Sequence, residues 1–324
     1  MTLGKILYLS YKDVVSVRLE MAEIIQALET MFHEKGEGRV EMPPKPGIHT
    51  MPDAFIHAMP AYIPALKSAG MKWVSGYPEN EKRGLPYITG LLILNDPETG
   101  IPIAVMDCTW ITAMRTGAAT AVSAKCLARP EASTVGILAC GVQGRSNLEA
   151  LNVLFPLKKV FAYDIHPENT KRFADEIRQR FDLEVFEVEE PKEAVIGCDL
   201  VVTSGPILKI PHATIQAGWL DAGAFASLVD FDSYWSAEAM LEADKICTDD
   251  HQQLDHYKAV GYFQDLPPVH ADLGELVTGK KTGRETSEER TMAVNLGLAL
   301  DDMAVAPLIY RKAIEQSLGT WLPL

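Results

Sequence analysis

One short segment combines glycine residues with a position that suits a dinucleotide phosphate. Ala139-Cys-Gly-Val-Gln-Gly144 lies between an apolar run ending at Leu138 and a helical pattern that starts near Arg145. A strand, a glycine turn and a helix N-terminus together present free backbone N–H groups to an anion. Alanine stands where the usual fingerprint has its first glycine. From this loop we expect four residues to bind the pyrophosphate: Gly141, Val142, Gln143 and Gly144.

A carboxylate follows this loop at a distance that suits a ribose. Asp164 ends the next strand pattern, about 20 residues on, where a carboxylate can accept bonds from both adenosine ribose hydroxyls. A 2′-phosphate there would meet a like charge, so the sequence predicts NAD(H) in preference to NADP(H), softened by His166 and Lys171 nearby. Alternatively, Asp164 only caps the turn into a helix that begins at Pro167. Thr203, which ends a later buried strand, is a further candidate for cofactor contact.

Strand and helix patterns alternate in the region that carries these residues, which predicts a parallel, doubly wound sheet in a Rossmann-type domain over residues 114–302. An Ala-rich helix over Thr116–Leu127 precedes it. Predicted strands cover Thr134–Leu138, Lys159–Asp164, Leu183–Val188, Asp199–Thr203 and Trp219–Ala224; predicted helices cover Asn147–Leu154, Asn169–Phe181, Lys192–Ile196 and Ser236–Leu241.

The N-terminal region has a different texture, which predicts an α+β lobe with an antiparallel sheet. Residues Met1–Ser10 alternate like a strand, and apolar residues at helical spacing predict one helix over Asp13–Lys35. A last helix, Thr291–Leu318, is expected to return to this lobe, giving a domain of residues 1–113 with 303–324. Short β-rich runs separated by Pro and Gly cover Ala54–Met59, Ser68–Val74, Ile88–Asn95 and Ile101–Met106, the last two joined by a hairpin turn over Asn95–Gly100.

Composition excludes several classes of protein. Apolar residues make up 47% and charged residues 23% of the chain, and no stretch reaches the roughly 20 uncharged apolar residues of a membrane span. The formal charge of −14 and the lack of a long Lys/Arg run argue against nucleic-acid binding. The five cysteines are scattered without CxxC pairs, so we expect reduced thiols, no metal site and a cytoplasmic protein. His251 and His256 point to different helix faces and are set aside as metal ligands.

Five blocks of sequence, in order, resemble the ornithine cyclodeaminase/mu-crystallin family over nearly the whole chain. The resemblance implies a homodimer, a substrate and dimerisation lobe, a Rossmann lobe, and an active site in the cleft, where a nicotinamide cofactor acts on amino acids or imines. The blocks are Lys72-Trp-Val-Ser-Gly-Tyr-Pro78, Ala104–Thr120, Gly141-Val-Gln-Gly144, Ala271–Lys280 and Leu296-Gly-Leu-Ala-Leu-Asp-Asp302.

The resemblance also implies roles for individual residues. Arg115 matches the arginine that binds the substrate carboxylate, and a planar guanidinium can hold a carboxylate bidentately. Lys72 matches the active-site lysine. It is flanked by Met71 and Trp73 on a predicted strand, and partial desolvation would lower its pKa toward the range useful for general acid–base catalysis. Thr116, at the start of the Ala-rich helix, is implied to contact the cofactor phosphates.

Two positions depart from the family pattern. Lys45 stands where many members have a second carboxylate-binding arginine, so its contact would be a point charge. Phe225 stands where cyclodeaminases are expected to have an aspartate after Gly-Ala, which argues against ornithine cyclisation and for a more apolar substrate side chain. Asp230 or Asp232 could supply a carboxylate instead, or could cap a turn.

The sequence therefore predicts hydride transfer between NAD(H) and the α-carbon of a small amino acid, or of an N-substituted or cyclic amine, and its imino or keto acid. Arg115 would anchor the carboxylate, Lys72 would move the proton and Lys45 would assist. NADP(H) would be a second choice of cofactor. Two alternatives stay open: a cyclodeaminase that releases ammonia, and a ligand-binding protein similar to mu-crystallin that no longer turns over. Substrate identity and reaction direction depend on the shape of the pocket.

Overall fold

The computed structural model describes residues 4–51 and 54–324, which form two compact units. One unit comprises the chain up to Arg115 together with Leu298–Leu324, and the other runs from Thr116 to Gly297. The two units have different sheets, one mostly antiparallel and one parallel, so the predicted fold class is confirmed. The predicted boundaries between the substrate and dimerisation domain and the Rossmann domain, after residues 113 and 302, stay a prediction. No helix among the described residues is long and apolar enough to cross a membrane.

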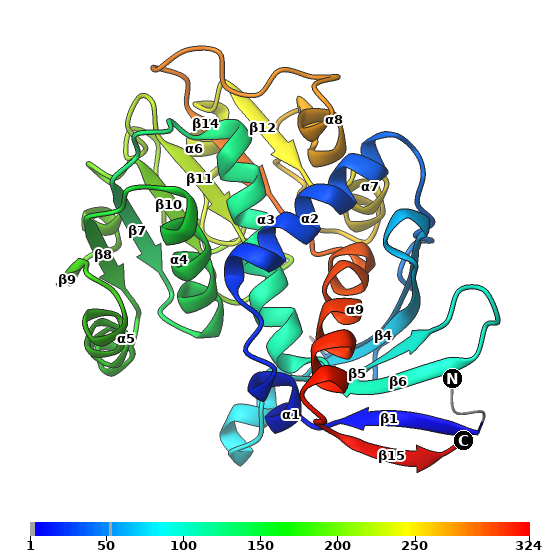
Figure 1. Ribbon diagram of the computed structural model, residues 1–324. Helices are drawn as coiled ribbons and strands as arrows, with labels where there is room; N and C mark the ends of the chain where they lie inside the picture. The colour runs from blue at the N-terminus through cyan, green and yellow to red at the C-terminus, as the bar shows by residue number, and fades with distance from the viewer. Residues whose placement is uncertain (1–3, 52–53) are drawn as a thin grey trace. The chain divides into compact units, whose positions relative to one another are not determined.

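The first unit is built on a seven-stranded sheet in the order β15-β1-β6-β5-β4-β3-β2. All neighbouring strands pair antiparallel except β1 and β6. Figure 1 shows β1 and β15 side by side at one edge, near the two chain ends. The strands are β1 (Lys5–Leu9), β2 (Gly47–Ile48), β3 (Phe55–Ile63), β4 (Ser68–Gly76), β5 (Ile88–Asn95), β6 (Pro102–Asp107) and β15 (Thr320–Pro323).

In the middle of this sheet, side chains alternate between its two faces. Met59, Lys72, Leu92 and Met106 are neighbours across β3, β4, β5 and β6, and all four are buried. Helix α9 (Ala299–Glu315) packs on β3, β4 and β5 and also contacts α2. The period of two therefore places Lys72 on the covered face of the sheet, while residues one position away point to the other face.

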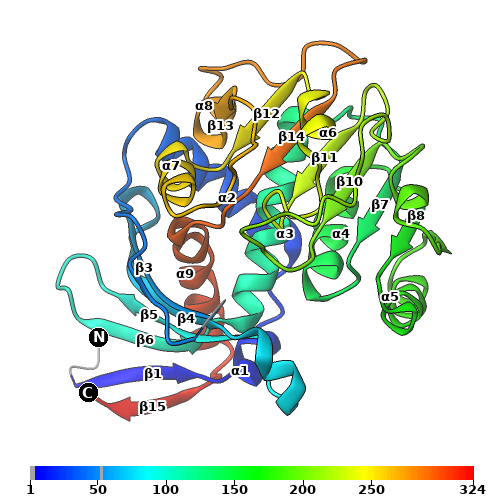
Figure 2. The ribbon, with the colours of Figure 1, turned by 180° about the vertical axis from the view of Figure 1, so that it is seen from behind.

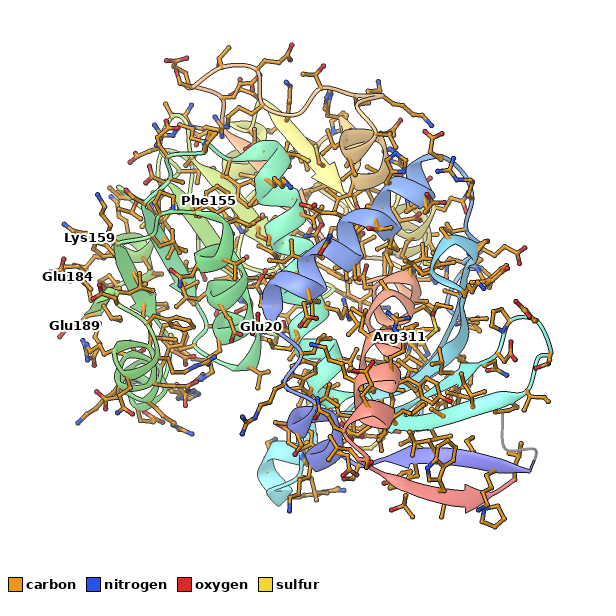
Figure 3. The ribbon with its side chains drawn as sticks, in the orientation of Figure 1. Glu20, Phe155, Lys159, Glu184, Glu189 and Arg311 are labelled. Atoms are coloured by element: carbon orange, nitrogen blue, oxygen red, sulfur yellow. The ribbon has the colours of Figure 1, made fainter. Side chains whose placement is uncertain are left out.

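The predicted helix Asp13–Lys35 is wrong in one respect, because the chain forms two helices. They are α1 (Tyr11–Ser16) and α2 (Met21–Gly36). Arg18 has a φ of 53°, in the left-handed region that a helix cannot include. Glu20, labelled in Figure 3, is the N-cap of α2. Its backbone N–H donates to the Glu23 carboxylate at 3.1 Å. The predicted N-terminal strand begins at Lys5, and Met1–Leu3 lie outside the described residues.

The second unit contains an eight-stranded sheet in which every pair of neighbours is parallel. Its order is β13-β12-β14-β11-β10-β7-β8-β9, so the chain moves outward from β7 in one direction and then returns to β10 on the other side. Figure 2 shows β11, β10, β7 and β8 in this lateral order. In Figure 3, Lys159 and Glu184 mark the starts of the paired strands β8 and β9. The point between β7 and β10, where the order reverses, is where such sheets bind ligands at the carboxyl ends of the strands.

The elements of this unit follow the predicted alternation with shifted bounds. The strands are β7 (Thr134–Leu138), β8 (Lys159–Tyr163), β9 (Glu184–Glu187), β10 (Leu200–Thr203), β11 (Phe225–Leu228), β12 (Lys245–Thr248), β13 (Ala271–Asp272) and β14 (Thr291–Val294). The helices are α4 (Val142–Leu154), α5 (Pro167–Arg180), α6 (Ala237–Leu241), α7 (His251–Ala259) and α8 (Leu273–Val277), with a 3-10 turn at Pro191–Ala194. The boundary between the two units, after Arg115, lies within helix α3 (Thr109–Leu127).

Two predicted elements in this region are wrong. Trp219–Ala224 is not a strand, because Gly223 has a φ of 81° in a turn and β11 begins only at Phe225. The predicted helix Thr291–Leu318 begins too early, because Thr291–Val294 is a fully buried central strand and the helix starts at Ala299. A short apolar run does not separate a buried strand from a buried helical turn.

Candidate functional site

Four charged side chains meet in the interior of the first unit. Lys72 Nζ lies 2.7 Å from Asp302 Oδ2, and Arg115 Nη1 lies 3.3 Å from Asp301 Oδ2. Arg115 Nε lies 3.6 Å from Asp302 Oδ1, which links the two pairs. We call Lys72, Arg115, Asp301 and Asp302 the charged cluster. Its formal charges cancel, which is the condition under which four ionised groups can share a buried site.

The first turn of α9 supplies both carboxylates. Asp301 Oδ2 accepts a hydrogen bond from the backbone N–H of Leu298 at 2.9 Å and so caps the helix. A helix N-terminus carries partial positive charge, which stabilises carboxylates in its first turn. Consecutive helical residues point in directions about 100° apart, so Asp301 and Asp302 reach different partners. The two aspartates are fully buried. The free-energy cost of burying their charges is offset by the helix cap, the helix N-terminus and the two cations.

The surroundings of Lys72 oppose its positive charge. Only 1% of the side chain is exposed, and this burial lowers the pKa of Lys72, with the charge of Arg115 acting in the same direction. Asp302 raises the pKa of Lys72 against these two effects. The Lys72 ammonium also donates to the Thr112 hydroxyl at 3.3 Å. A lysine held in this balance can give up or take a proton far more readily than one in water.

Arg115 keeps hydrogen-bonding capacity for a ligand. Its Nη1 donates to Asp301 Oδ2 at 3.3 Å, although a guanidinium carries five N–H donors. Its Nε is buried and has no hydrogen-bond partner among residues 4–51 and 54–324. A buried donor without a partner costs free energy, which a bound carboxylate would recover.

Lys45 approaches this face of the sheet from the edge. It is partly exposed and lies two residues before Gly47, which pairs with His57 in β3. The backbone N–H of Ala58 donates to the Pro46 carbonyl at 2.9 Å, so the antiparallel register continues past β2. Carried one residue further, this register sets Lys45 opposite Met59, whose other neighbour is Lys72.

The glycine loop of the second unit has the geometry of an anion site. Gly141 is the N-cap of α4, and a Cβ added to it would meet open space. At Gly144 a Cβ would lie 2.6 Å from the Ala139 carbonyl oxygen, so only glycine fits there. Ala139 has a φ of 74°, which explains why this position usually has glycine. Val142 is 65% exposed at the start of a helix whose first N–H groups have no intrahelical acceptor, so the loop fits a dinucleotide phosphate.

Asp164 fixes this loop and remains partly exposed. Its two carboxylate oxygens accept hydrogen bonds from the backbone N–H groups of Cys140, at 2.8 Å, and His166, at 3.0 Å. Each carboxylate oxygen can accept more than one hydrogen bond, so capping the turn and binding a ribose are compatible. The ribose contact stays a prediction.

Thr203 and Phe225 both have fully buried side chains, but they lie at opposite ends of their strands. Thr203 is fully buried, donates its hydroxyl to Asp230 Oδ1 at 2.6 Å and accepts a bond from Trp235 Nε1 at 3.2 Å. Phe225 is fully buried at the amino end of β11, whereas ligands bind at the carboxyl ends of such strands. Phe225 therefore gives no ground against ornithine cyclisation. Thr116 is buried next to Arg115 in α3.

Two buried aspartates lie beyond the carboxyl end of β11. Burial raises the pKa of Asp230 to about 7 and that of Asp232 to about 6. Asp232 Oδ1 has no hydrogen-bond partner within the part of the chain that the structure describes. Both lie at the ligand-binding edge of the sheet, which makes them better candidates than Phe225 for a polar contact in this unit.

No role for Asp301 or Asp302 follows from the sequence pattern alone. A signal was present, because two consecutive aspartates follow Gly297 at the start of a helical pattern, where acidic residues are favoured. Their partners, Lys72 and Arg115, are distant in the chain, so no local pattern connects the four residues.

The fold and these sites define a dinucleotide-binding α/β unit joined to an antiparallel unit that has a lysine, an arginine and two aspartates in its interior. The chain matches the model of the ornithine cyclodeaminase/mu-crystallin family over residues 8–317, and it belongs to that family.

Three relatives illustrate the similarity. The chain is 35% identical to an alanine dehydrogenase of Archaeoglobus fulgidus, over 97% of each chain. The structure of a Thermococcus litoralis Δ1-pyrroline-2-carboxylate reductase with NADH and L-proline superposes with a TM-score of 0.88 and 33% identity, covering 97% of this chain and 99% of that one. An archaeal alanine dehydrogenase dimer with bound NAD has a TM-score of 0.88 and 35% identity, covering 99% of each chain.

Proposed function

We propose that the protein is an NAD(H)-dependent oxidoreductase that interconverts a small amino acid, or an N-substituted or cyclic amine, with its imino or keto acid. The observation that carries this proposal is the charged cluster, which holds a lysine of lowered pKa and an arginine with spare N–H groups in one buried place. The relatives named above act on alanine or reduce a cyclic imino acid, substrates that share a carboxylate beside a carbon–nitrogen bond.

The residues of the first unit bind and orient the substrate. Arg115 holds the carboxylate through the face of its guanidinium that Asp301 leaves open, which fixes the position of the α-carbon. Lys72 holds the proton that the substrate nitrogen gains on reduction and loses on oxidation. Lys45 adds a positive charge at the edge of the sheet. When bound, the nicotinamide supplies or accepts the hydride.

The residues of the second unit hold the cofactor. Gly141, Val142, Gln143 and Gly144 would bind the pyrophosphate at the start of α4, with Thr116 as a further phosphate contact. Asp164 would accept bonds from the adenosine ribose, which favours NAD(H) because a 2′-phosphate would meet its negative charge. Thr203 lies at the end of β10 and would line the cofactor site there. Its hydroxyl would not be the contacting group, because it is bonded to Asp230. Asp230 and Asp232 are candidates for a polar contact with the substrate.

The open face of the first unit's sheet supports a homodimer. Trp73 is 43% exposed, Leu91 is 44% exposed and Tyr8 is 38% exposed, while Met71 and Ile93 between them are partly exposed. These five residues are neighbours on one face, by register and alternation. An apolar sheet face of this kind is typical of a protein interface. A second copy of the chain is the partner we propose, consistent with the archaeal relative that is a dimer. We place the protein in the cytoplasm, where its cofactor and substrates are found.

The test is a spectrophotometric screen of purified protein. Amino acids are offered with NAD and NADP, and cyclic imines or mixtures of keto acid and amine are offered with the reduced cofactors. We expect cofactor oxidation with at least one imine and faster reaction with the NAD pair. Ammonia release from ornithine without net change of the cofactor would instead identify a cyclodeaminase. No reaction with any substrate, together with tight binding of cofactor, would contradict the enzyme assignment.

A further inference from the structure

The ammonium of Lys72 has one carboxylate within ion-pair distance among the described residues, that of Asp302. Their 2.7 Å separation is a charge-assisted contact, and neither side chain exceeds 1% exposure. Because both side chains are buried, the attraction is much stronger than between charges at the surface. The protonation of Lys72 therefore depends on Asp302 more than it would at an exposed site.

The other groups around Lys72 do not replace this carboxylate. Thr112, from α3, offers a neutral hydroxyl at 3.3 Å. Burial raises the pKa of the Cys108 thiol to about 11, so the thiol stays neutral near pH 7. Arg115 contributes a positive charge that favours loss of the Lys72 proton. The sheet neighbours on either side of Lys72, Met59 and Leu92, are apolar.

The two aspartates of α9 make different contacts. Asp301 caps the helix through Leu298 and contacts Arg115 Nη1. Asp302 takes no part in the cap; its Oδ2 faces Lys72 and its Oδ1 lies 3.6 Å from Arg115 Nε. Asp301 thus contacts the arginine and caps the helix, whereas Asp302 is the carboxylate that pairs with the lysine and also lies near the arginine.

We propose that Asp302 is a positioning residue that holds Lys72 in place and keeps it protonated, so that Lys72 is the proton donor for imine reduction. This inference rests on the proposed function. In the reductive direction the imine nitrogen takes a proton from the Lys72 ammonium, and the α-carbon accepts the hydride from the reduced nicotinamide. The neutral Lys72 amine then regains a proton from water. One proton and one hydride are consumed, and the C=N bond becomes a C–N bond.

The first experiment measures the charge of Lys72 without turnover. The full-length protein is labelled with ¹³Cε-lysine, the Lys72 resonance is assigned by its absence in Lys72→Met, and its shift is followed with pH. In the wild type we expect a protonated Lys72 at pH 7. In Asp302→Asn the titration midpoint should fall by roughly 1 to 3 pH units, the range produced by a nearby opposite charge. Asp301→Asn is the matched control, since it removes an equally buried carboxylate from the same turn, and its midpoint should fall less.

The second experiment follows activity. Asp302→Asn should lower the rate of imine reduction about 10- to 100-fold at pH 8 and recover part of it at lower pH, since it impairs but does not abolish a proton transfer worth about 10²- to 10⁴-fold. Asp301→Asn should mainly raise the KM for the substrate, because it disturbs Arg115. Asp302→Glu, which keeps the carboxylate, should restore part of the Asp302→Asn loss at pH 8.

Two outcomes overturn the inference. One is a wild-type Lys72 that is already neutral at pH 7, a result that needs no variant to fold. The other is a Lys72 titration that Asp301→Asn shifts as much as Asp302→Asn. If the substrate screen finds no oxidoreduction but the titration behaves as expected, the proposed function fails and the Asp302–Lys72 coupling stands. If turnover is found and the titration is unchanged, only the role of Asp302 fails.

Discussion

Lys72 on β4 and Asp302 in the first turn of α9 form an ion pair of 2.7 Å inside the first unit. The Lys72 ammonium lies on the covered face of the sheet, and the Asp302 carboxylate faces it from the helix that packs on that face. Arg115 and Asp301 complete a set of four charges that cancel, so no charge of the cluster is left without an opposite partner in the interior.

Lys72→Met removes the ammonium and keeps an unbranched side chain on the buried face. We expect turnover to fall by about 10²- to 10⁴-fold, the contribution usual for a positioned acid–base group. Cofactor affinity, measured by fluorescence of bound NADH, should change little, since the glycine loop is intact. Turnover equal to that of the wild type would remove Lys72 from the mechanism.

Arg115→Lys keeps the positive charge and loses the planar fork. Substrate KM should rise roughly 10- to 100-fold with a smaller change in kcat, because a point charge cannot hold a carboxylate bidentately. Steady-state kinetics at a saturating cofactor concentration separate the two parameters. If kcat falls and KM is unchanged, the guanidinium acts on the transition state and not on carboxylate binding.

Asp164→Asn tests the cofactor preference. The amide keeps the size of the side chain and one acceptor oxygen for the turn, but it removes the negative charge beside the ribose. The ratio of kcat/KM for NAD over NADP should fall by about tenfold or more, as expected for loss of a charged hydrogen bond and of repulsion toward a 2′-phosphate. A ratio that does not move would assign Asp164 to the turn alone.

Trp73→Glu tests the dimer. A carboxylate on the open sheet face should convert the protein to monomers, which analytical ultracentrifugation detects. Trp321→Glu is the matched control, because Trp321 is 46% exposed on the same sheet and pairs with Leu7, whose side chain lies on the opposite face. Dissociation by both substitutions, or by neither, would contradict an interface on the Trp73 face.

The buried Asp230 predicts how stability changes with pH. Its pKa is raised from an unfolded value of 3.8 to about 7, so between these values the folded protein binds a proton that the unfolded chain has released. The free energy of unfolding contributed by this group therefore falls as pH rises from about 4 to 7, by about 1.4 kcal/mol per pH unit at most.

Asp230→Asn, which cannot ionise, should flatten this slope in denaturant unfolding at pH 5, 6, 7 and 8. It keeps an acceptor for Thr203 and loses the long bond of 3.3 Å from the Gly205 N–H. A variant whose stability falls with pH as steeply as that of the wild type would show that Asp230 is not the group responsible.

Much of the fold follows from local signals in the sequence. The bounds Ile88–Asn95 and Thr134–Leu138 agree with β5 and β7, since turn residues and apolar runs mark both ends. The glycine loop was recognisable because Gly141 and Gly144 stand close together in the sequence, and at Gly144 the structure leaves no room for a Cβ. Where two conformations share one pattern, as for the buried strand Thr291–Val294 within a predicted helix, the tertiary environment decides.

For the candidate site too, some features follow from the sequence and others only from the tertiary structure. The sequence by itself determined the family, the two kinds of unit and the residue types that can do the chemistry, Lys72 and Arg115 among them. Only the tertiary structure decided which partners set their charge, that Phe225 lies at the amino end of its strand, and that Asp302, but not Asp301, pairs with Lys72. The physical reason is that electrostatic energies depend on distance and burial, and residues remote in the chain acquire both only when the helix docks on the sheet.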